Sequence, residues 1–172
     1  KLRKGSDVVA QSLALAPEIR QQVDSVKLLQ ALAGSGPITT AEAAGALQQA
    51  LDTYRGDFLA HFHLRDAPRF DEWVALTREH IHLQVIAAYH KLGRYAQSAG
   101  DLERAIAVAR RWLTVDALDE AAHLLLVRSL IEAGNTHAAA AHYDHCAELL
   151  RAELGVEPSA ALAALIKDVR PK

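Results

Sequence analysis

The second half of this chain repeats itself at an offset of 34 residues. Six of the 16 positions from 92 to 107 carry the same residue 34 positions later. The identical pairs are Leu92/Leu126, Arg94/Arg128, Ala99/Ala133, Gly100/Gly134, Ala105/Ala139 and Ala107/Ala141. A period of roughly 20–50 residues is typical of structural units that stack, because one unit cannot bury its apolar face alone. The repeat therefore predicts an array of stacked units.

A period of 34 residues is the length of the tetratricopeptide repeat, whose unit is two helices joined by a turn. Gly100 and Gly134 are predicted to form the turn within each unit. Ala105 and Ala139 fall where the second helix crosses closest to the first, so a large side chain there would hold the two helices apart.

Two departures make the repeats degenerate. The bulky position near the start of the first helix is filled by Tyr89 in one unit and by His123 in the next. Ala117 stands where a proline usually follows the second helix. The predicted fold does not depend on these two positions, but the angle between the two units cannot be predicted from them.

Alanine and leucine, two strong helix formers, supply 59 of the 172 residues. We therefore expect an all-α array of about seven helical segments, preceded by a short extended segment. The helices are predicted over residues 23–33, from a capping box at 39–42 to Gly56, and over 68–99, 101–113, 119–133, 135–154 and 158–169. The longest carries apolar residues every three or four positions, and we expect it to bend at Gly93.

The first 16 residues read differently from the rest of the chain. Residues 8–15 are compatible with a strand that Pro17 ends. We predict that residues 1–16 are the end of a preceding module and that residues 17–172 form the helical domain. The sequence contains no methionine, so we expect it to be a piece of a longer protein.

Charge and motif content exclude several classes of function. The chain carries 19 Lys and Arg against 21 Asp and Glu, which leaves no basic stripe for nucleic acid. No apolar run reaches the ~20 residues that span a bilayer. The sequence has no phosphate loop, nucleophile elbow or dinucleotide fingerprint, so we expect neither an enzyme nor a cofactor.

Nine histidines raise the question of a metal site. The densest cluster is His137, His142, His145 and Cys146, and the last is four residues from His142, a spacing that zinc can use. A metal-dependent hydrolase would need this cluster to bind metal. The repeat register instead places Cys146 on the packed side of its helix, where a free cysteine behaves as a small hydrophobe. We therefore predict no metal site.

Four further motifs, in order, resemble a known family. They are Tyr54–Leu59, Phe70–Trp73 followed by Arg78 and Glu79, Leu113–His123, and Glu153–Ser159. Together they resemble the bacterial transcriptional activation domain of regulators of the antibiotic-regulatory-protein type, over roughly Val23–Ile166. The resemblance implies a tetratricopeptide-like domain in a cytoplasmic regulator, behind a winged helix-turn-helix that binds DNA. Residues 1–16 would then be the end of that module, and its DNA-reading helix is expected to lie outside this sequence.

The first helix of each unit carries an arginine at the same register, Arg94 and Arg128. In the tetratricopeptide pattern this face lines a concave groove, and the other residues predicted to line it are His90, Gln97, Leu124 and Ile131. Two guanidinium forks suit a partner segment that carries carboxylates. The alternative is that Arg128 pairs with Glu132 four residues on and that Arg94 is simply solvated.

These expectations combine into one function and one alternative. We predict a non-enzymatic domain for protein interaction and oligomerisation in a bacterial transcription regulator. Its partners would be RNA polymerase or other domains of the same regulator, with DNA contacted only through the helix-turn-helix and no membrane involved. The alternative is a stand-alone tetratricopeptide-like adaptor or sensor unrelated to DNA.

Overall fold

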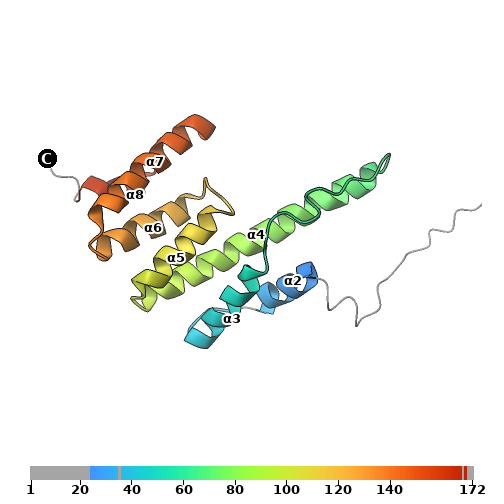
Figure 1. Cartoon of the computed structure of the whole chain (residues 1–172), viewed down its shortest axis with the longest axis horizontal. Helices are drawn as coiled ribbons and strands as arrows, with labels where there is room; N and C mark the ends of the chain where they lie inside the picture. The colour runs from blue at the N-terminus through green and yellow to red at the C-terminus, as the bar shows by residue number, and fades with distance from the viewer. Residues whose placement is uncertain (1–23, 35, 168, 170–172) are drawn as a thin grey trace, which may run out of the picture.

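The computed structural model describes residues 24–34, 36–167 and 169. In these residues the chain forms seven helices and no strand, which confirms the predicted all-α fold (Figure 1). The helices are α2 (Asp24–Gly34), α3 (Ala41–Asp52), α4 (Pro68–Ser98), α5 (Leu102–Leu113), α6 (Glu120–Glu132), α7 (Thr136–Leu154) and α8 (Ala160–Lys167). The extended segment predicted at the N-terminus lies outside the described residues.

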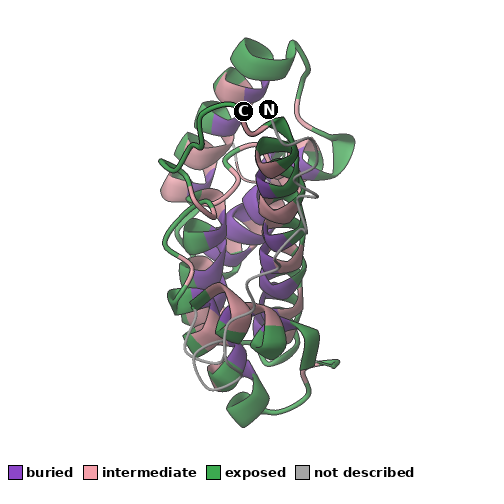
Figure 2. Ribbon diagram, turned by 90° about the vertical axis from the view of Figure 1, so that its right-hand side faces the viewer, coloured by how far each residue is buried: buried purple, intermediate pink, exposed green. Residues whose placement is uncertain are grey.

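The helices pack as successive hairpins, α2 with α3, α4 with α5 and α6 with α7, and α8 packs on α6 and α7. The first helices of the hairpins also contact each other in order, α2 with α4 and α4 with α6. Buried residues from all seven helices join into one core (Figure 2). The array therefore has the layered arrangement that the 34-residue repeat predicts.

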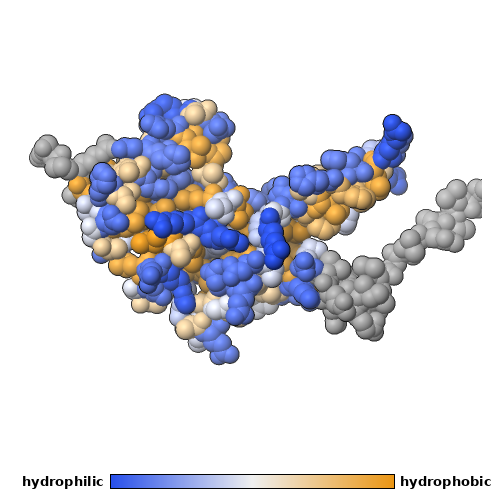
Figure 3. Space-filling model, viewed as in Figure 1, coloured by the Kyte–Doolittle hydropathy of each residue, from blue (hydrophilic) through white to orange (hydrophobic). Residues whose placement is uncertain are grey.

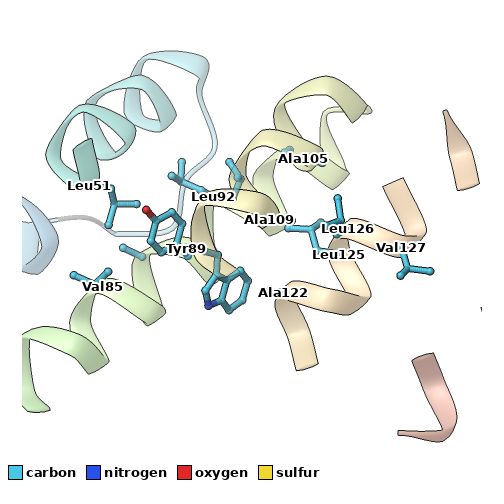
Figure 4. Packing of buried hydrophobic residues seen from close by; sticks show 14 of the residues in the cluster. Leu51, Val85, Tyr89, Leu92, Ala105, Ala109, Ala122, Leu125, Leu126 and Val127 are labelled. Carbon is cyan, nitrogen blue, oxygen red and sulfur yellow. The ribbon is translucent and has the colours of Figure 1, made fainter. Parts of the chain in front are cut away.

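The repeated small residues hold the hairpins together. Gly100 and Gly134 adopt φ of 66° and 76°, a left-handed conformation that is cheap only for glycine, and each turns the chain between paired helices. Ala105 and Ala139 are fully buried. Figure 4 shows Ala105 and Ala109 of α5 lying among larger core side chains of the neighbouring helices.

Helix α4 spans 31 residues and runs unbroken through Gly93, where a bend was expected. A Cβ atom placed on Gly93 would lie 2.7 Å from Leu125 Cδ2 of α6. Because Cβ atoms essentially never sit that close to another heavy atom, the glycine allows α6 to approach α4.

Helix α3 differs from its prediction at both ends. Thr40 is the N-cap, and its hydroxyl accepts from Ala43 N at 3.2 Å, so the cap lies one residue later than the predicted capping box requires. The helix ends at Asp52 instead of continuing to Gly56, and Thr53 is its C-cap, with its hydroxyl donating to Ala50 O at 2.7 Å. The last helix, α8, likewise begins two residues after the expected Pro158.

The segment between α3 and α4 folds back along the first turns of α4, and together they form a projecting arm, residues 53–83 (Figure 1). Arg78 fixes this segment by donating from Nε to Phe58 O at 2.6 Å and from Nη2 to Leu59 O at 2.5 Å. Phe58 also meets Trp73 edge to face, with 5.7 Å between ring centroids. Two of the sequence motifs are thus parts of one local structure.

We predict that Ala105→Leu lowers the free energy of unfolding by about 1–3 kcal/mol, because it overpacks the closest helix crossing. The matched control is Ala107→Leu, which puts the same side chain on the exposed face of the same helix and is expected to change stability by less than about 0.5 kcal/mol. Thermal melts of both variants measure the difference. Equal melting temperatures would contradict the packing role of Ala105.

Candidate functional site

A small hollow of about 140 Å³ lies between α4, α5 and α6. Because α4 and α6 are the first helices of successive hairpins, it lies on the face where the sequence predicts a groove. Its walls come from three helices of two repeat units. The lining residues are His90, Gly93, Arg94, Gln97, Trp112, Ala121, Leu124, Leu125 and Arg128.

Five of the six predicted groove residues line this hollow: His90, Arg94, Gln97, Leu124 and Arg128. Ile131 does not. It lies seven residues after Leu124 on the same face of α6, one turn past Arg128, and it packs partly buried against the core.

The two arginines differ in exposure. Arg94 is exposed, whereas Arg128 is half-buried because α6 lies packed against neighbouring helices. Among the described residues neither arginine forms an ion pair, and the alternative pair between Arg128 and Glu132 is not formed. Two guanidinium groups thus border the hollow without a carboxylate partner from the described chain.

Trp112 of α5 is a lining residue that the sequence reading missed. Its indole is 2% exposed, stacks on Tyr89 with ring centroids 6.2 Å apart, and meets the edge of the His90 ring at 4.3 Å. Indole Nε1 is buried and has no hydrogen-bond partner in the described part of the chain. Leaving such a donor unpaired costs about 1–3 kcal/mol.

Gly93 is the second lining residue that was not predicted. Its missing side chain leaves space between His90 and Arg94, while Leu125 closes in from α6. A glycine inside a strong helical pattern is a sequence signal for such a close approach. No comparable signal marks Trp112, because its position depends on the angle between hairpins.

A second polar feature joins α6 to α7. His123 is 2% exposed, and its Nε2 lies 2.9 Å from Ala117 O. Because a carbonyl oxygen only accepts, His123 Nε2 carries the proton, and its Nδ1 therefore accepts from Nε2–H of His142 at 2.9 Å. His123 occupies the bulky position that Tyr89 fills in the preceding unit, and the half-buried His142 of α7 pairs with it.

Burial shifts the protonation of this region. Burial and the neighbouring His123, His145 and Arg110 lower the pKa of His142 to about 4. Burial also lowers the pKa of His123, against the opposing effects of the Ala117 carbonyl and of Asp119 and Glu120. Both rings are therefore neutral at pH 7.

Cys146 is fully buried, and burial raises the pKa of its thiol to about 11. A thiol in that state is neither a good nucleophile nor a ready metal ligand. The described residues contain no group of three or more His, Cys, Asp or Glu arranged to hold a metal ion. Nor does any described helix have the length and apolarity to cross a bilayer.

Comparison with known proteins gives one match. The model of a family described as the bacterial transcriptional activator domain matches residues 23–170, which confirms the resemblance carried by the four motifs. Neither curated proteins nor solved structures give a significant match to the chain.

We predict that the His123–His142 pair makes the fold sensitive to acid. Both pKa values lie below the ordinary histidine value of about 6.5, so between about pH 4 and 6.5 the unfolded chain binds protons that the folded chain does not. The free energy of unfolding is therefore greatest above pH 6.5 and falls as the pH decreases through this window. Thermal melts at pH 7.5 and 5.0 measure the effect.

The matched variant for this prediction is His142→Gln, whose amide can donate to His123 Nδ1 but does not titrate. Its melting temperature is expected to fall less between the two pH values than that of the parent chain. Equal decreases in the two proteins would show that other groups cause the acid sensitivity.

Proposed function

This chain belongs to the family of bacterial transcriptional activator domains, and we propose that it serves a transcription regulator as a protein-interaction domain. The hollow between α4, α5 and α6 binds an acidic segment of the partner protein. The partner is RNA polymerase or another domain of the same regulator, in the bacterial cytoplasm where transcription takes place. The domain performs no catalysis of its own.

The observation that carries this proposal is that neither arginine has a carboxylate partner among the described residues. Arg94 and Arg128 border one hollow from successive repeat units, and no described carboxylate pairs with either. An arginine fork binds a carboxylate through two parallel hydrogen bonds, and such charge-assisted bonds are about twice as strong as neutral ones. An acidic side chain in the hollow would supply the acceptors that the fold itself does not provide.

Charge argues against the alternative that this chain binds DNA by itself. The net charge is −2, and neutralising several phosphates needs a cluster of Lys and Arg. We propose that DNA is contacted through a helix-turn-helix elsewhere in the regulator. A stand-alone adaptor remains the second candidate, because a tetratricopeptide-like array can bind partners without any link to DNA. The sequence that precedes Lys1 in the gene distinguishes the two.

We predict that Arg94→Ala and Arg128→Ala each reduce transcription activation by the full-length regulator while changing stability by less than about 1 kcal/mol. Losing one charge-assisted fork is expected to weaken binding of the partner segment by about 1.5–3 kcal/mol. A promoter–reporter assay and thermal melts measure the two effects separately.

The matched control is Arg110→Ala, which removes an exposed arginine of α5 outside the hollow and should leave activation unchanged. Arg94→Lys keeps the charge but not the fork, so it should give an intermediate loss. Full activation by both alanine variants, with unchanged melting temperatures, would show that the arginines are only a solvated face.

A further inference from the structure

The arm carries apolar side chains that no part of the described chain covers. Trp73, Leu76 and Leu83 of α4 are 50%, 66% and 56% exposed, and His80 between them is also exposed. Their spacing of three, four and three residues puts all four along one side of the helix. Apolar surface is visible along the arm in Figure 3. Clustered exposure of this kind marks an interaction surface.

This apolar stripe, defined as Trp73, Leu76, His80 and Leu83, points the same way as the hollow. Arg94 follows Leu76 by 18 residues, which is five helical turns and brings it to the same side of α4 about 27 Å away. Ala87 and His90 lie between them on that side, and both are exposed. The stripe and the hollow are therefore two ends of one open face of α4.

We infer that one partner segment covers both ends of this face, and that the segment is an amphipathic helix with apolar residues at one end and carboxylates at the other. This inference rests on the proposed binding of an acidic segment in the hollow. The apolar end packs on Trp73, Leu76 and Leu83, and the acidic end reaches Arg94 and Arg128. About 20 helical residues, ~30 Å long, match the length of the face.

The charges beside the stripe also favour this occupant. Glu72 and Glu79 border the stripe on one side, seven residues apart and both exposed. Basic residues beside the apolar anchors of the partner would meet them. Exposed Arg69 stands on the same side at the tip of the arm, Glu72 and Glu79 border the stripe, and Arg94 and Arg128 border the hollow. A partner with basic residues beside its apolar anchors and carboxylates at its other end therefore meets opposite charges along most of the face.

A second copy of this chain fits the same face poorly. An antiparallel pair of α4 stripes that sets Trp73 beside Leu83 places Glu72 of one copy beside Gln84 of the other and Glu79 beside Thr77, so no opposite charges meet across it. Such a pair would also offer no carboxylate to Arg94. The charge pattern thus favours a different protein segment over self-association.

The chain contains only two tryptophans, and each reports one end of the face. Trp73 belongs to the stripe, and Trp112 lines the hollow. Trp112→Phe removes an indole whose N–H has no described partner, so it breaks no described hydrogen bond and leaves Trp73 as the sole tryptophan. Trp73→Phe leaves Trp112 alone.

The probes are three synthetic 21-residue helical peptides. The first carries Leu at i, i+3 and i+7 with flanking Lys in one half and a cluster of Glu in the other. The second has Gln in place of Glu, and the third has Ser in place of Leu. The first peptide is expected to shift Trp73 emission to the blue and to protect it from acrylamide, with each of the other two binding at least about tenfold more weakly.

The variants test the two ends separately. Leu76→Gln combined with Leu83→Gln should weaken binding of the first peptide at least about tenfold and leave binding of the third unchanged. Arg94→Ala should weaken both. The matched control is Leu154→Gln, which alters a leucine of 55% exposure at the end of α7, far from this face, and should change nothing.

Several outcomes would overturn the inference. If binding of the first peptide depends on Arg94 but not on Leu76 and Leu83, the proposed function stands and the shared face does not. If the first peptide, which carries both Leu and Glu, does not bind saturably, the inference fails. If the third peptide, which keeps the Glu cluster but lacks Leu, does not bind either, the proposed function fails as well. If acrylamide does not quench Trp73 in the chain without peptide, the stripe is already covered by this chain. If Leu76→Gln converts a dimer to a monomer in sedimentation, the stripe is covered by a second copy. Either result overturns the inference.

Discussion

The contact between Gly93 and Leu125 is the constraint on which the rest of this array depends. A Cβ atom on residue 93 would lie 2.7 Å from Leu125 Cδ2, so a larger residue there would displace the end of the Leu125 side chain. Together with the more extensive packing of α5 on α6, this approach positions the second hairpin against the first. It also brings Arg94 and Arg128 to the same hollow and leaves Trp112 in its wall. Gly93 thus contributes both to the packing of Leu125 in the core and to the shape of the hollow on the surface.

The two repeat units fill the bulky position of the first helix with side chains of different chemistry. Tyr89 fills the bulky position of the first unit and stacks on Trp112 with 11° between the ring planes. His123 fills the same position in the second unit, but a histidine there needs partners for both ring nitrogens. Ala117 O and His142 provide them. The second unit therefore holds its helices together partly through polar contacts that depend on protonation, whereas the first relies on aromatic packing.

Much of this fold could be predicted from local signals. Gly100, Gly134 and Gly155 close their helices with positive φ, where glycine is the expected residue. The end of α3 could not be predicted, because the chain leaves the helix at Thr53, whose backbone N–H and hydroxyl both donate to Ala50 O, before the more obvious Gly56. The five groove residues follow from helical register alone, whereas Trp112 reaches the hollow only through the angle between hairpins. Similarly, no sequence rule links His123 to His142, which are 19 positions apart.

The N-terminal part of α4 extends beyond the helices that pack on it. The helix is packed against α2 and α3 as far towards its N-terminus as Ile81, and Pro68 at the tip of the arm lies 13 residues further, or about 20 Å. A tilt of about 5° around the Ile81 contact would therefore move the tip by about 2 Å. The displacement caused by a change of angle where α4 leaves the core would therefore be largest at the tip of the arm.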